Sequence, residues 1–185
     1  MTITDTAELP RIIGISGYSG VGKTAVGYMI AEETRLPVVH MADPLKKIIR
    51  ELDPFDQHGV LLSTYLEIGG EAKAKADHDK YRHALRTIGE GVRDILPAFW
   101  LRALAKECVG MHSVIVPDIR HPEDADACAV LLNVTRPGVN SDGHSTERDM
   151  SALASHHLYN NGDLATLSAK VHAFVNDLEI SPNEY

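Results

Sequence analysis

Residues 11–24 read Arg-Ile-Ile-Gly-Ile-Ser-Gly-Tyr-Ser-Gly-Val-Gly-Lys-Thr, and this stretch decides the fold. Its first six residues form a short run that is rich in β-branched isoleucine and is followed by glycine. Such a run is typical of a buried parallel strand. Residues 17–24 match the pattern G-x-x-x-x-G-K-[ST] in full. Val26, Met29 and Ile30 then share one face of a helix. The stretch therefore predicts a strand, a phosphate-binding loop and a helix in succession.

The composition of the loop predicts its chemistry. Glycines let successive backbone N–H groups turn inward and form an anion-binding nest at the helix N-terminus. The ammonium of Lys23 can reach the β and γ phosphates of a nucleotide, and the hydroxyl of Thr24 can ligate Mg²⁺. The residues expected to bind the nucleotide are Gly17, Ser19, Gly20, Val21, Gly22, Lys23 and Thr24.

The rest of the chain repeats the alternation of strand and helix. Further strands are predicted at residues 37–41, 112–117, 129–135 and, more weakly, 155–159. Such alternation predicts an α/β protein of three layers, with about five parallel strands and helices on both faces of the sheet.

The predicted domain organisation is simple, because 185 residues suffice for one α/β domain. Residues 1–10 are expected to form a flexible leader, residues 11–178 a single domain, and residues 179–185 a tail. Residues 42–96 are expected to form an insertion and residues 136–149 a short lid.

The formal net charge of −8 argues against nucleic-acid or anionic-membrane binding, which needs a basic field. No stretch of the sequence is apolar enough to span a membrane. Cys108 and Cys128 lack metal-ligand spacing and suit a reducing compartment, so we expect a cytoplasmic protein. The ten histidines show no metal-binding pair on one helical face.

Asp118 closes the strand predicted at residues 112–117. There it is placed to hold Mg²⁺, or alternatively it starts a turn before His121. Arg120 can stabilise the charge of a transferred phosphoryl group, or it can pair with Glu123 or Asp124.

Arginines recur along the helix predicted near residues 81–94. Arg82, Arg86 and Arg93 lie on one stripe with Glu90. This stripe is either a solvated face with an Arg86–Glu90 ion pair or a binding site for a second phosphate-bearing substrate. A polar segment at residues 136–148 has an arginine at each end, which favours a lid that excludes water over an ordinary surface loop.

Several further motifs resemble those of the phage-type deoxynucleoside monophosphate kinases, a branch of the P-loop kinases. They are Met41-Ala-Asp-Pro-Leu-Lys46, the segment from Arg86 to Arg93, the segment from Pro117 to Ala125, Val134-Thr-Arg-Pro-Gly138 and Asn160-Asn-Gly-Asp-Leu164. The chain departs from the family pattern at Glu90-Gly91, where the family has Thr-Glu, and at Thr146, where it has Ser.

The resemblance implies a P-loop kinase fold and a reaction between two nucleotides. ATP with Mg²⁺ would be the phosphoryl donor, and a (deoxy)nucleoside monophosphate the acceptor. By the resemblance, the acceptor is bound by Asp43, Lys46, Arg86 and Arg93, and Arg120 and Arg136 act in transfer together with Lys23. The loop from Asn160 to Asp163, including Asn161, would lie near the base of ATP, and Thr24 and Asp118 would hold the metal ion.

Two other functions are compatible with the phosphate-binding loop. One is a kinase of the dephospho-coenzyme A or phosphomevalonate type. The other is a GTP-dependent switch, which needs an N-K-x-D segment that this sequence lacks. The expected partners are small nucleotides, and the sequence leaves open whether the protein is a monomer or a homodimer.

Overall fold

The structure is a computed structural model that describes residues 9–53, 55, 59–61, 64, 79–141, 143 and 148–178, and only the backbone of 79–84. Residues 1–8 of the predicted leader, the predicted tail, much of the segment 54–78 and part of the predicted lid lie outside this description. The chain divides into two compact units. We call Met1–Met41 with Leu101–Tyr185 the sheet unit, and Ala42–Trp100 the helical unit.

The sheet unit contains four parallel strands. They are β1 (Arg11–Ser16), β2 (Ser113–Val116), β3 (Val130–Thr135) and β4 (His156–Tyr159), in the order β2-β1-β3-β4. Ile13 of β1 pairs with Ile115 of β2 on one side and with Val130 of β3 on the other. The predicted α/β fold with a parallel sheet is confirmed, with four strands in place of about five.

The missing strand is the one predicted at residues 37–41. Val38 makes an isolated parallel bridge to Ile115, with Val39 N donating to Ile115 O at 2.9 Å and Ile115 N donating to Pro37 O at 2.9 Å. These two hydrogen bonds place the segment beside β2. The chain then leaves the edge of the sheet and enters α2 (Asp43–Leu52). The pairing with β2 is therefore limited to one bridge, which is too short to count as a strand.

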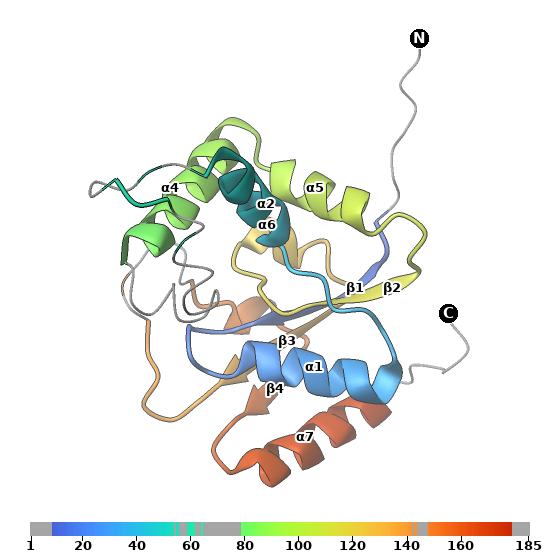
Figure 1. Cartoon of the computed structure of the whole chain (residues 1–185). Helices are drawn as coiled ribbons and strands as arrows, with labels where there is room; N and C mark the ends of the chain where they lie inside the picture. Colours follow the sequence, from blue (N-terminus) through green and yellow to red (C-terminus); the bar gives the residue numbers. More distant parts are fainter. Residues whose placement is uncertain are drawn as a thin grey trace. The chain divides into compact units, whose positions relative to one another are not determined.

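Two helices cover one face of the sheet. Helices α1 (Lys23–Thr34) and α7 (Leu164–Asp177) lie side by side in the lower part of Figure 1. Their apolar side chains join those of alternate strand residues in one buried cluster, which includes Ile13, Ile15, Val26, Ile30, Leu132, Val171 and Phe174. The cluster explains the 3.6-residue spacing of the apolar side chains along both helices.

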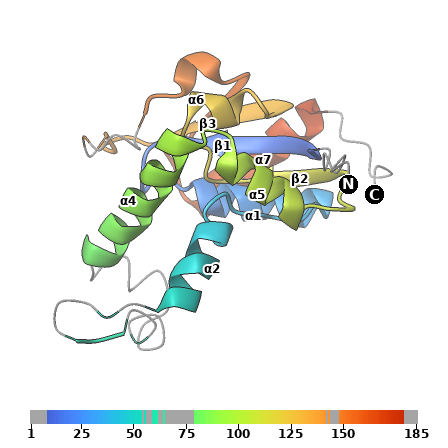
Figure 2. The ribbon, with the colours of Figure 1, turned by 90° about the horizontal axis from the view of Figure 1, so that it is seen from above.

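The other face of the sheet packs against different elements. Figure 2 shows the short helix α6 (Pro122–Ala125) across the sheet from α1. A side chain at Gly14 of β1 would collide with Cys128 and Ile119 on this face, so the glycine allows close packing there.

Burial and the neighbouring Asp124 carboxylate raise the pKa of the Cys128 thiol to about 12, so the thiol stays protonated. The sequence did not predict α6, and the 3-10 helix at Ser151–Leu153 was also not predicted.

The helical unit is built on α2 and α4 (Asp79–Ile95), which contact one another. A side chain on Gly89 of α4 would touch the Leu45 side chain of α2 at 3.4 Å. Trp100 Nε1 donates to the Gly89 carbonyl at 2.9 Å and so fixes the start of α5 (Phe99–Glu107) to α4. None of the described helices is long and apolar enough to cross a membrane.

Candidate active site

The loop between β1 and α1 has the backbone that its sequence predicts. Gly17 and Gly22 have φ values of 129° and 102°, in a region that residues with a side chain rarely adopt. A side chain at position 17 would also collide with the Val134 carbonyl of β3, and one at position 22 would lie 2.9 Å from Asn160 Nδ2. Both positions therefore require glycine on two separate grounds.

The loop presents backbone donors at the start of α1. The N–H groups of Gly20 and Gly22 donate to no acceptor among the residues that the structure describes. Gly22 is the N-cap of α1, no side chain caps this helix end, and its first turn carries no acidic residue. Unsatisfied donors on a glycine loop at a helix N-terminus make a site for an anion such as phosphate.

Lys23 lies across this loop. Its Nζ donates to the carbonyl of Gly17 at 2.7 Å and to the carbonyl of Tyr18 at 2.8 Å. The ammonium is thus held beside the backbone donors, where a polyphosphate would meet both. The side chains of Ser19 and Thr24 are exposed, so the Thr24 hydroxyl is open to a metal ion bound with a nucleotide.

Asp118 follows β2, the strand next to β1 in the sheet. One of its carboxylate oxygens, Oδ1, accepts from Met41 N at 2.8 Å, which anchors the end of the 37–41 segment. The carboxyl ends of neighbouring parallel strands meet at one edge of a sheet, so Asp118 belongs to the same edge as the loop. The carboxylate of Asp118 and the hydroxyl of Thr24 are the hard oxygen ligands that suit Mg²⁺.

Two arginines extend from this edge. Arg120 follows β2 and Arg136 follows β3, the two neighbours of β1. Both side chains are exposed, and neither has an ion-pair partner among the residues that the structure describes. An ion pair of Arg120 with Glu123 or Asp124, the alternative that the sequence allowed, is therefore not observed.

The loop after β4 also contacts the phosphate-binding loop. Asn160 is buried, and its Nδ2 donates to the Val21 carbonyl at 2.8 Å. The neighbouring Asn161 accepts through Oδ1 from Lys170 Nζ at 2.6 Å. Asp163 caps α7 by accepting from Thr166 N at 2.8 Å, and hydrogen bonds from Thr166 lower the pKa of this carboxyl. The resemblance had indicated the loop from Asn160 to Asp163, but the contacts of Asn160 with Val21 and of Lys170 with Asn161 were not predicted, because neither follows from a local spacing.

The residues predicted to bind an acceptor all lie in the helical unit. Lys46 Nζ pairs with Asp43 Oδ1 at 2.8 Å, and the lysine is buried. Arg86 and Arg93 are half-buried on α4, and Arg93 Nη1 donates to the Pro97 carbonyl at 3.4 Å. Lys and Arg side chains are seldom withdrawn from water, so the burial of Lys46 and the half-burial of Arg86 and Arg93 mark them as candidates for a site.

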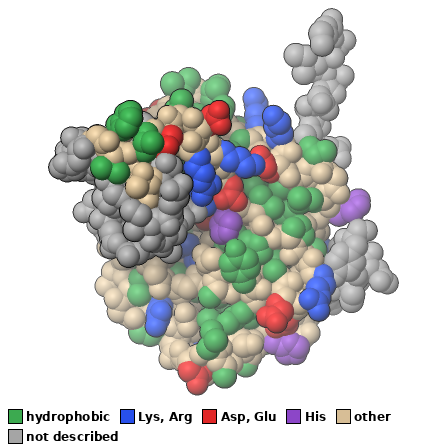
Figure 3. All heavy atoms as spheres, in the orientation of Figure 1, with side chains coloured by type: hydrophobic (Ala, Val, Ile, Leu, Met, Phe, Trp, Pro, Cys, Tyr) green, Lys and Arg blue, Asp and Glu red, His purple; other side chains and the backbone are tan. Residues whose placement is uncertain are grey.

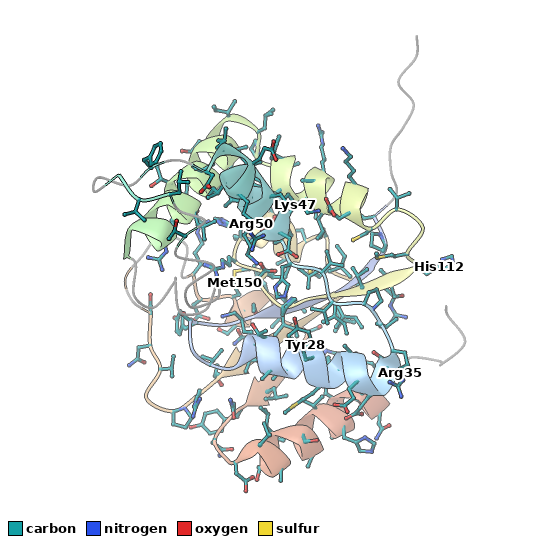
Figure 4. All side chains as sticks on the ribbon, in the orientation of Figure 1. Tyr28, Arg35, Lys47, Arg50, His112 and Met150 are labelled. Atoms are coloured by element: carbon teal, nitrogen blue, oxygen red, sulfur yellow. The ribbon has the colours of Figure 1, made fainter. Side chains whose placement is uncertain are left out.

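Lys47 and Arg50 add cations on the exposed side of α2. Lys and Arg side chains gather there in Figure 3, and Figure 4 labels both residues on this helix. Lys47 neighbours Lys46 in sequence yet is exposed where Lys46 is buried. The two lysines therefore provide a matched pair for mutation.

The structure thus gathers the predicted site residues into two sets. The loop residues, Asp118, Arg120, Arg136 and Asn161 belong to the sheet unit, and the four predicted acceptor residues belong to the helical unit. Within the described part of the chain, no three His, Cys, Asp or Glu residues cluster as a metal site. A Mg²⁺ ion held by Thr24 and Asp118 would therefore take its other ligands from a nucleotide and water.

The parallel sheet and its glycine loop define an α/β protein with a phosphate-binding P-loop. The structure is similar to the solved structure of TT1252 from Thermus thermophilus, with a TM-score of 0.53 and 18% identity over 92% of this chain and 99% of that chain. A shikimate kinase from Bacteroides thetaiotaomicron aligns with a TM-score of 0.42 and 14% identity, over 92% of this chain and 99% of that chain. The first similarity shows a shared fold, and the second is too low to support an argument. No protein-family profile and no curated protein matches the sequence.

The loop geometry predicts that Gly22→Ala weakens the binding of a nucleoside triphosphate by at least about tenfold, because the strained backbone misdirects a donor to the phosphates. Titration with MgATP, followed by calorimetry, measures this change. Gly110→Ala is the control, because Gly110 has a φ of 84° and open space around it. Equal losses of affinity in the two variants would contradict the assigned role of the loop.

Proposed function

We propose that this protein is a kinase that transfers the γ-phosphoryl group of ATP to a (deoxy)nucleoside 5′-monophosphate. The observation that carries the proposal is the glycine loop of the sheet unit, with its unsatisfied N–H groups and Lys23 beside them. The motifs around Asp43, Arg86 and Asp118, which resemble those of deoxynucleoside monophosphate kinases, support the choice of acceptor.

The donor half of the proposed reaction uses the sheet unit. Backbone N–H groups of the loop and the Lys23 ammonium bind the β and γ phosphates, and Thr24 and Asp118 hold Mg²⁺. The metal ion would neutralise negative charge on the phosphate oxygens. Arg120 and Arg136 have no ion-pair partner among the described residues, so they are available to stabilise the charge of the transferred group.

The acceptor half uses the cations of the helical unit. Lys46, Arg86 and Arg93 bind the monophosphate, and arginine pairs with phosphate oxygens in a two-point geometry. Asp43 holds Lys46 in place through their 2.8 Å ion pair, and in the proposed reaction it would accept from a sugar hydroxyl. These three side chains would supply local positive charge for an anionic substrate, in a chain whose net charge is −8.

The chemical step needs little from the protein beyond positioning. An oxygen of the acceptor phosphate, already ionised, attacks the γ-phosphorus while the bond from that phosphorus to the β–γ bridging oxygen breaks. The products are a nucleoside diphosphate and ADP. A strong general base is not required, so in-line placement and charge neutralisation supply the catalysis. Closure of the segment at residues 136–149 would exclude water and suppress hydrolysis of ATP.

The first prediction from this function concerns substrate choice. We expect ADP release from ATP to depend on an added nucleoside monophosphate, in a coupled assay over dAMP, dGMP, dCMP, dTMP and their ribose counterparts. Lys23→Ala should reduce the rate by about 100-fold or more, because the γ-phosphate loses its charged contact. Activity with dephospho-coenzyme A or phosphomevalonate alone would instead support a kinase for another acceptor.

The second prediction concerns the acceptor site. Lys46→Met should raise the KM for the monophosphate by about tenfold to 100-fold while the KM for ATP changes little, because a charged hydrogen bond to the acceptor phosphate is lost. Lys47→Met removes the same charge from the exposed neighbour and should leave both constants near the wild-type values. Equal effects of the two substitutions would show that the buried lysine has no specific role.

A further inference from the structure

Asn160 is the first residue of the 160–164 motif, to which the sequence gave no role of its own. Its side chain is 8% exposed, and its Nδ2 donates to the Val21 carbonyl at 2.8 Å. Val21 and Asn160 are 139 positions apart in sequence, so this hydrogen bond joins the loop after β4 directly to the phosphate-binding loop.

The contact determines the direction of one peptide plane. The bond between Val21 and Gly22 is trans, so the Val21 C=O and the Gly22 N–H point in opposite directions. Since the carbonyl points at Asn160, the Gly22 N–H points away from it. That N–H donates to no acceptor among the described residues and lies at the N-terminus of α1, where an anion is expected.

The position of Asn160 is itself fixed on both sides. Its backbone N donates to the Thr135 carbonyl at the end of β3, at 2.8 Å. Lys170 of α7 donates through Nζ to the Tyr159 carbonyl and to Asn161 Oδ1, each at 2.6 Å. The residues before and after Asn160 are thus tied to one helix, so its amide cannot easily move away from the loop.

Two other carbonyls of the loop have a different partner. Those of Gly17 and Tyr18 accept from Lys23, a residue that must also reach the phosphates. The Val21 carbonyl accepts from Asn160, so this contact does not involve Lys23. Asn160 therefore holds the plane of the Val21–Gly22 peptide without the Lys23 side chain.

We propose that Asn160 is a positioning residue for the donor phosphates, which acts by holding the Gly22 N–H in the direction of the anion. The proposal rests on the proposed function only in that the loop binds a triphosphate. It does not depend on the identity of the acceptor.

Two substitutions separate the hydrogen bond from packing. Asn160→Ala removes the donor and leaves a space, whereas Asn160→Leu removes the donor and keeps a branched side chain with the same number of heavy atoms. Both should weaken the binding of MgATP and of Mg²⁺ with inorganic triphosphate by about tenfold or more, as expected when one charge-assisted hydrogen bond is lost. In the wild type, the amide signal of Gly22 in a ¹⁵N-resolved spectrum should move on addition of either ligand. In both variants this movement should be reduced.

Thr34→Val controls for a general loss of stability. Thr34 is also 8% exposed, and its hydroxyl donates to the Ile30 carbonyl at 2.7 Å at the other end of α1. Figure 4 labels Arg35, the next residue, at that end, with Tyr28 nearer the loop. Thr34→Val should lower the free energy of unfolding, measured in urea by circular dichroism, yet bind triphosphate as the wild type does.

The outcomes distinguish the inference from the proposed function. Wild-type affinity and a wild-type Gly22 shift in Asn160→Leu would overturn the inference alone. An equal loss of affinity in Thr34→Val would also overturn it, because the effect would then follow from stability. A wild-type protein that binds no triphosphate would overturn both the inference and the proposed function.

Discussion

The backbone of the loop between β1 and α1 must turn its N–H groups toward one point while its carbonyls point elsewhere. Glycines at positive φ make this turn accessible, and specific donors then hold the carbonyls. Lys23 binds two of these carbonyls and Asn160 a third. The close approach of Gly17 to the Val134 carbonyl fixes the loop against β3 as well. The site therefore depends on the sheet order that sets β3 beside β1.

That sheet order also explains why the candidate residues come from distant parts of the sequence. The loop follows the central strand β1, Asp118 and Arg120 follow β2, and Arg136 follows β3. All belong to the carboxyl edge of one parallel sheet, where ligands of open α/β folds bind. The helical unit holds Lys46, Arg86 and Arg93, and the proposed reaction draws on both sets.

Local sequence predicted the parts of the fold that local chemistry determines. The strand at Arg11–Ser16, the glycine loop and the start of α1 follow from β-branched residues, a fixed glycine pattern and an apolar face. The segment at residues 37–41 has the composition of a strand, yet it makes only a bridge to β2 because the chain leaves the sheet for α2. The role of Asn160 was not predictable, since it depends on β4, α7 and the loop coming together.

The central claim is that the loop binds ATP and directs its γ-phosphoryl group to a nucleotide acceptor. The most direct measurement follows the label from γ-³²P-ATP in the presence of Mg²⁺ and a mixture of deoxynucleoside monophosphates, with the products separated by chromatography. The account predicts that the label appears in a deoxynucleoside diphosphate. Label that appears only as inorganic phosphate, or that stays in ATP, would contradict it.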